Sequence, residues 1–176
     1  MDNFRYLPQK PTFFNPDGLA VGFVKESYQG KDYVGYTCAA CHTGQVNYKG
    51  QALRIDGGPA MADMVGFLTA LEKAMKATQA DAQKRDRFVQ AVLARDNSYS
   101  SADEVTKDLA KWTNTIILYN TVNHSHLDYG YARLDAFGRI YNRVLQHVIN
   151  KEQLKLALLS VANPDSSRLL NVQQVD

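Results

Sequence analysis

The chain has 176 residues, of which 45% are hydrophobic and 22% are charged, and its formal net charge is +2. These values are typical of a single globular domain with a packed core, and they exclude a disordered chain. So small a net charge gives no electrostatic reason to expect nucleic acid as a partner. The apolar stretches are far shorter than the roughly 18 residues that a membrane span needs, so we expect no membrane-spanning segment.

Residues 1–35 are rich in proline, glycine and aromatic residues. The prolines and glycines follow one another too closely for a long helix, which predicts an extended segment that wraps around the rest of one domain, 1–176. The N-terminus carries no apolar stretch of the kind found in export signals.

The most informative motif is Cys38-Ala39-Ala40-Cys41-His42, which contains both cysteines of the chain. It matches the C-x-x-C-H attachment signature of c-type haem. In this chemistry two thiols one turn apart add to the haem vinyl groups as thioethers, and the adjacent histidine binds the iron. We therefore predict one covalently bound haem c, held by Cys38 and Cys41, with His42 as the proximal iron ligand.

Three other interpretations of the two cysteines stay open. In the first, the cysteines form a buried, inert pair. In the second, they form a thioredoxin-like redox pair, which requires a βαβ setting. In the third, they belong to a zinc site, which requires a fourth ligand beside Cys38, Cys41 and His42. Because haem c is attached outside the cytoplasm, the haem interpretation predicts a periplasmic or secreted bacterial protein whose export signal is not part of this sequence.

The residues after the motif predict a short β-hairpin and then helices. Lys49-Gly50 lies between two stretches suited to strands, 46–48 and 51–55. Pro59 suits the first position of a helix, and apolar residues at helical spacing follow it as far as Met75.

Further helices are expected in the second half of the chain. One covers residues 80–95, and the next opens with a capping box at Ser101 and Glu104. A fourth begins near Arg133, and a short fifth covers 152–161. The predicted fold class is therefore mainly α, a cytochrome c-like haem domain with about five helices and a small β-hairpin.

Several side chains are candidates for contacts with the haem. A guanidinium binds a carboxylate through two parallel hydrogen bonds, so Arg54, Arg133 and Arg139 are candidates for the haem propionates. The sixth iron position decides between electron transfer and chemistry at an open iron. Its candidate ligands are Met61, Met64, His124, His126 and His147, although methionines on an apolar helix face more often fill the core.

Three stretches together resemble a known family, and the middle one is the most specific. They are residues 18–23, residues 36–45 continuing to 55–63, and residues 131–139. They look like the N-terminal haem region of rubber-oxygenase-like (latex-clearing) di-haem c-type cytochromes, which are related to bacterial di-haem cytochrome c peroxidases. The resemblance implies that His42 is the proximal ligand of an N-terminal haem and that Phe137 lies near its distal face as the catalytic-site residue.

The chain departs from that family because it has no second C-x-x-C-H motif. Either a C-terminal haem domain is missing and this is a fragment, or the chain is a single-haem relative confined to electron transfer. The expected function is electron transfer by the haem iron, with a redox protein or the missing haem domain as partner. The alternative is the oxygen- or peroxide-activating domain of a larger haem-dependent oxidoreductase, which uses a small oxidant.

Overall fold

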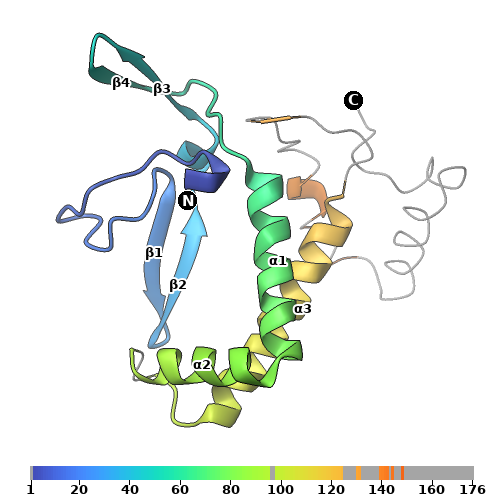
Figure 1. Cartoon of the computed structure of the whole chain (residues 1–176). Helices are drawn as coiled ribbons and strands as arrows, with labels where there is room; N and C mark the ends of the chain where they lie inside the picture. Colours follow the sequence, from blue (N-terminus) through green and yellow to red (C-terminus); the bar gives the residue numbers. More distant parts are fainter. Residues whose placement is uncertain are drawn as a thin grey trace, which may run out of the picture.

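The computed structural model describes residues 2–95, 98–124, 130–131, 139–142, 144 and 148. Its elements follow one another as two β-hairpins and then three helices (Figure 1). A short 3-10 helix, η1 (Asp2–Phe4), precedes the hairpins, and a second one, η2 (Cys38–Ala40), lies between them. None of the helices in the described part of the chain has the length and apolar composition that crossing a bilayer requires.

The first hairpin pairs β1 (Phe23–Tyr28) with β2 (Lys31–Tyr36), and the second pairs β3 (Thr43–Tyr48) with β4 (Gln51–Asp56). The two turn residues of each hairpin have positive φ: 50° and 75° at Gln29 and Gly30, and 47° and 77° at Lys49 and Gly50. These are the signs that a tight two-residue turn needs to match the twist of its strands.

The predicted fold class, mainly α with a single small hairpin, is wrong. The described residues form two separate antiparallel two-stranded sheets and three long helices, a mixed α and β architecture. The second hairpin at Lys49-Gly50 was predicted and is confirmed. The first was missed because Gly30 was interpreted only as a residue that prevents a long helix, whereas it also completes a tight turn between residues 23–28 and 31–36.

The helices begin at side-chain caps. α1 (Met64–Ala80) starts after Asp63, whose carboxylate accepts a hydrogen bond from the Gly66 N–H at 2.8 Å. The prediction that Pro59 is the first helical residue is wrong, because the cap lies four residues further along the chain. α2 (Ala82–Leu93) starts after Asp81, which caps the Lys84 N–H at 3.1 Å.

α3 (Ala102–Val122) begins at the predicted capping box, which is confirmed. The Ser101 hydroxyl accepts from the Glu104 N–H at 3.2 Å, and the Glu104 carboxylate accepts from the Ser100 N–H at 3.0 Å. Of the predicted fourth helix, residues 139–142, 144 and 148 are helical, and the rest lies outside the described residues, as does the predicted fifth helix, 152–161.

The helices form one layer beside the first hairpin. α1 and α3 run side by side, α2 crosses below them, and the β3–β4 hairpin projects away from the body (Figure 1). The tip of the first hairpin contacts α3, where Lys31 Nζ lies 3.2 Å from Asp108 Oδ2 and the rings of Tyr33 and Trp112 are 6.2 Å apart.

The hydrophobic core gathers where the N-terminal segment, the first hairpin and the start of α1 meet. Its buried residues are Tyr6, Ala20, Phe23, Ala40, Ala60, Ala62, Met64 and Leu68. Ala40 belongs to the C-x-x-C-H motif, and Cys41 packs against the same cluster. The motif is therefore attached directly to the core.

Candidate haem attachment site

The C-x-x-C-H motif folds as one tight turn. The backbone N–H groups of Cys41 and His42 both donate to the Cys38 carbonyl, at 3.1 and 2.8 Å. In a 3-10 helix the side chains of residues i and i+3 eclipse one another, so Cys38 and Cys41 lie on one side of η2. Cys38 is exposed and Cys41 is half-buried. Two thiols in this register are compatible with attachment to neighbouring vinyl groups of one ring.

The turn rests directly on Gly22. The Thr37 N–H, just before the motif, donates to the Gly22 carbonyl at 2.8 Å. Gly22 has a φ of 83°, and a Cβ there would overlap the backbone of Ala40 and lie 2.6 Å from its Cβ. Only glycine combines this backbone conformation with so close an approach. The C-x-x-C-H turn therefore depends on a residue 16 positions before Cys38.

The base of the second hairpin fixes the other side of the turn. The His42 carbonyl accepts from the Gly57 N–H at 2.7 Å, and the Cys41 carbonyl accepts from the Ala60 N–H at 2.9 Å. β3 begins at Thr43, so the hairpin grows directly out of the motif. The His42 side chain is exposed on this turn.

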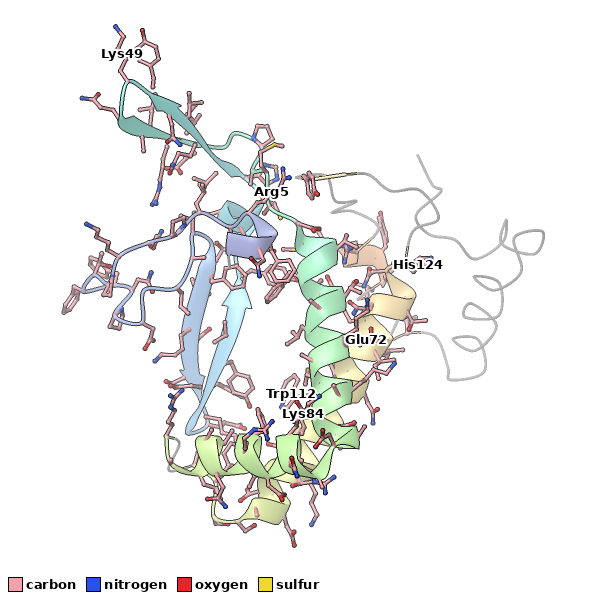
Figure 2. All side chains as sticks on the ribbon, viewed as in Figure 1. Arg5, Lys49, Glu72, Lys84, Trp112 and His124 are labelled. Atoms are coloured by element: carbon pink, nitrogen blue, oxygen red, sulfur yellow. The ribbon has the colours of Figure 1, made fainter. Side chains whose placement is uncertain are left out.

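Aromatic rings surround the turn on its helical side. The rings of Tyr6 and Phe23 meet edge to face with centroids 4.8 Å apart, and Phe67 of α1 lies 5.8 Å from each. Tyr36, at the end of β2, shares a hydrogen bond with Tyr119 of α3, with 3.1 Å between the hydroxyl oxygens. Figure 2 shows Trp112 lower on α3, in the region between the helices and the first hairpin.

The surroundings of the Tyr6 hydroxyl indicate whether these residues fit an attached haem. Tyr6 is 3% exposed, and within the described part of the chain its hydroxyl has no hydrogen-bond partner. Burial raises the pKa of Tyr6, and the neighbouring Cys41 and Asp63 add to the rise. A buried hydroxyl without a partner costs about 1–3 kcal/mol. The turn thus has two paired thiols and, beside Cys41, the buried Tyr6 hydroxyl, which needs a hydrogen-bond partner. This arrangement is compatible with a polar group or water held next to Tyr6 when haem is attached.

Neither the thioredoxin-like nor the zinc interpretation gains support. Burial raises the pKa of the Cys41 thiol, the opposite of the depression that activates a redox cysteine. The strand pairs found in the described residues are antiparallel hairpins, not a βαβ unit. Among the described residues, no three His, Cys, Asp or Glu side chains are grouped as ligands of a metal ion.

The predicted propionate ligands lie at different places. Arg54, on β4, donates from Nη2 to the Pro8 carbonyl at 2.6 Å and so ties the second hairpin to the N-terminal segment. Arg139 is half-buried and donates from Nη1 to the Tyr119 hydroxyl at 3.2 Å. Arg139, and not Arg54, is linked through Tyr119 to Tyr36, two residues before the motif. Arg133 and Phe137 lie outside the described residues.

The candidates for the sixth iron ligand are also separated. Met64 is 4% exposed and belongs to the core behind the turn, whereas Met61 is 59% exposed and follows Ala60, which is bonded to Cys41. His124 lies just beyond the C-terminal end of α3 (Figure 2). His126 and His147 lie outside the described residues.

Sequence reasoning missed the residues that support the motif. Gly22 was interpreted as a residue that prevents a long helix and as part of the family-like stretch 18–23, and Tyr6, Tyr36 and Tyr119 were given no individual role. For Gly22 the signal was available, since a glycine just before a strand often marks a close backbone approach. For the tyrosines no local signal existed, because the partners are 83 residues apart in the chain.

Comparison with known proteins finds a similar protein in Sinorhizobium fredii. The chain is 38% identical over 115 residues to the "Uncharacterized protein y4iJ" of Sinorhizobium fredii (strain NBRC 101917 / NGR234). The match covers 63% of this chain and 19% of that protein, so the chain spans about a fifth of the length of the curated relative it matches. No protein-family profile and no solved structure matches the chain.

Proposed function

We propose that this chain carries one haem attached covalently to Cys38 and Cys41 and acts as a one-electron carrier. The observation that carries the proposal is the form of the motif: a single turn that presents both thiols on one side, followed at once by an exposed imidazole. When bound, the haem supplies an iron that alternates between the ferrous and ferric states.

The chain's own residues have separate tasks in this proposal. Cys38 and Cys41 form the thioethers, and a nitrogen of His42 binds the iron. Gly22 and Ala40 hold the turn against the core. The half-exposed ring of Tyr36 and its partner Tyr119 supply an apolar wall, as a flat cofactor requires.

Location and partner follow from the same chemistry. Haem c is attached outside the cytoplasm, so the proposal places the mature protein in the periplasm or outside the cell. Its partner is a second redox protein or haem domain that exchanges one electron with it. The resemblance to the N-terminal region of rubber-oxygenase-like cytochromes points to a haem domain of the latter kind and stays a prediction.

A second candidate is an oxygen- or peroxide-activating haem domain, and one observation favours it. Met64, the methionine closest to the core, is buried on the inner side of the turn, where it packs as core filling and not as an iron ligand. If no other protein ligand occupies the sixth iron position, the ferrous protein will bind carbon monoxide readily. A six-coordinate spectrum that ignores carbon monoxide supports the electron carrier alone.

The proposal is tested by producing the chain together with a cytochrome c maturation system. Haem should stay with the denatured protein in acid-acetone extraction, and the intact mass should equal that of the polypeptide plus one haem. Cys38→Ala with Cys41→Ala should abolish the covalent link, and His42→Ala should keep the link but change the ligand field. Asp86→Asn, at an exposed position of α2, serves as the control: the protein should still gain the mass of one haem and keep the wild-type spectrum. Haem that extracts completely from the wild-type chain contradicts the proposal.

A further inference from the structure

Arg139 is linked to the segment before the motif through two tyrosine hydroxyls in series. Its Nη1 donates to the Tyr119 Oη at 3.2 Å, and the Tyr119 Oη lies 3.1 Å from the Tyr36 Oη. The guanidinium carbon is 5.7 Å from the centre of the Tyr119 ring, within range of a cation–π contact. Since Tyr36 is two residues before Cys38, the hydrogen-bonded chain ends at the attachment turn.

The backbone that carries Arg139 is fixed at a second point, one helical turn away. Asn142 Nδ2 donates to the Val122 carbonyl at 3.0 Å and to Asn123 Oδ1 at 3.1 Å. Asn123 Nδ2 in turn donates to the Tyr119 carbonyl at 2.8 Å, and both asparagines are buried. The bond to Val122 occupies a carbonyl in the last turn of α3, where the helix leaves carbonyls without a partner of its own. Arg139 is therefore anchored through both its backbone segment and its guanidinium.

The charge of Arg139 acts on the segment before the motif. It opposes the rise that burial causes in the pKa of Tyr36, two residues before Cys38. Among the described residues, Arg139 forms no ion pair with a carboxylate. A half-buried positive charge without a counter-charge interacts more strongly with a nearby site than an exposed and screened one.

We propose that Tyr119 and Tyr36 are positioning residues that hold the charge of Arg139 beside the haem attachment turn, and that this charge raises the reduction potential of the haem. The inference rests on the proposed function. When one electron from a reductant converts ferric to ferrous iron, the site loses one positive charge, so a fixed cation nearby favours the reduced state. The tyrosines act only through Arg139.

This role differs from the propionate contact predicted from the sequence. The vinyl and propionate groups lie at opposite edges of the haem ring, and Arg139 is linked through Tyr119 to Tyr36, two residues before the first cysteine that takes the vinyl edge. An arginine that paired with a propionate would hold that carboxyl ionised, and its loss would make the potential depend on pH near neutrality. A charge at the attachment edge shifts the potential equally across that pH range.

The test is a redox titration of the haem-loaded full chain, followed by its optical spectrum. Arg139→Gln should lower the potential by the same amount at pH 6 and pH 8. Tyr119→Phe, which keeps the ring and removes only the hydroxyl, should lower it by a smaller amount. The double variant should match Arg139→Gln alone. Tyr99→Phe is the control, because Tyr99 also uses its hydroxyl, donating to Asp108 at 3.0 Å, but near the opposite end of α3.

Two results overturn the inference while leaving the haem proposal intact: a covalently loaded protein whose potential is unchanged by Arg139→Gln, or a Tyr119→Phe effect that persists undiminished when Arg139 is already glutamine. A double-mutant cycle tests the contact between Arg139 and Tyr119 directly. The quantity measured is the free energy of unfolding of the haem-free single and double variants. Arg139→Gln and Tyr119→Phe should be coupled, whereas Arg139→Gln and Tyr99→Phe should be additive. Additivity in both pairs rejects the positioning role. Wild-type protein that never acquires covalent haem rejects the proposed function and the effect on potential together.

Discussion

At the scale of single residues, two glycines with almost the same backbone conformation differ in what surrounds them. Gly22 has a φ of 83° and Gly30 a φ of 75°. A Cβ at Gly30 would meet nothing within 4 Å, whereas one at Gly22 would overlap the backbone of Ala40 inside the motif. Substitutions at the two glycines therefore separate the free-energy cost of a positive φ from the cost of displacing the attachment turn.

We predict that Gly30→Ala lowers the free energy of unfolding by about 1–2 kcal/mol, the cost of a left-handed conformation for a residue with a Cβ. Gly22→Ala should lose a further 1–3 kcal/mol, roughly, because the overlap forces the turn to move. It should also reduce the fraction of chains that carry covalent haem. Urea unfolding and the ratio of haem to protein measure the two effects. Equal stability and equal haem content in the two variants would show that Gly22 does not support the turn.

At the scale of elements, the first hairpin is fastened to the helices at its tip as well as at its base. Lys31 lies 3.2 Å from Asp108 and, through its Nζ, 4.6 Å from the centre of the Tyr99 ring. The Tyr99 hydroxyl donates to the same carboxylate. The base is held by Phe23 and Phe67. The ion pair therefore links the hairpin to the start of α3 across a distance of 77 residues in sequence.

The hydrogen bonds from Lys31 and Tyr99 lower the pKa of Asp108 in the folded protein. A carboxyl whose folded-state pKa is lowered stabilises the fold above its unfolded pKa, about 3.9 for aspartate, and loses that contribution as the pH falls through the folded value. Asp108→Asn should therefore cost about 0.5–1 kcal/mol at pH 7, the size expected for a partly exposed pair. The difference from wild type should shrink below about pH 3.9. Thermal unfolding from pH 7 to pH 2.5 checks this, with the exposed Asp86→Asn on α2 as control. A difference that stays constant with pH would rule out the ion pair as its source.

Local signals in the sequence predicted the elements that local chemistry determines. Ser101 and Glu104 marked the start of α3, and Lys49-Gly50 marked a turn, because caps and tight turns depend on a few adjacent residues. The first hairpin was missed since β1 and β2 carry charged residues and Gly35, which hide the alternation of apolar and polar side chains. The wrong prediction of a mainly α fold followed from that omission.

The candidate site was predictable only where it is contiguous in sequence. The spacing of Cys38, Cys41 and His42 is sufficient by itself to predict haem attachment, and that attachment stays a prediction. The contacts that hold Arg139 depend on where α3 ends and on how β2 meets it, and no short stretch of sequence encodes that meeting. Arg54 was expected at a propionate; in the structure its Nη2 donates to the carbonyl of Pro8, and the propionate contact stays a prediction.

At the scale of the whole molecule, the motif and the core are one structure. Ala40 of the motif, Met64 and Leu68 of α1, and Tyr6 of the N-terminal segment belong to a single buried cluster. The β3–β4 hairpin, by contrast, is exposed along β4 and along the second half of β3. Substitutions that destabilise the core should therefore also disturb the proposed haem site, whereas substitutions on the projecting hairpin should not.

Leu68 and Leu53 allow that expectation to be tested with the same substitution. Leu68 is 5% exposed and Leu53 is 64% exposed. Leu68→Ala should cost about 2–5 kcal/mol, because it removes buried methyl groups and leaves a cavity behind the turn. That is a large share of the roughly 5–15 kcal/mol that stabilises a domain, so the variant should also be loaded with less haem. Leu53→Ala should stay within about 0.5 kcal/mol of wild type and be loaded normally. Urea unfolding followed by circular dichroism gives the stabilities, and absorbance per mole of protein gives the haem content. If Leu68→Ala loses stability but keeps full haem content, the turn forms independently of the core, and the attachment motif would have to be regarded as a surface element.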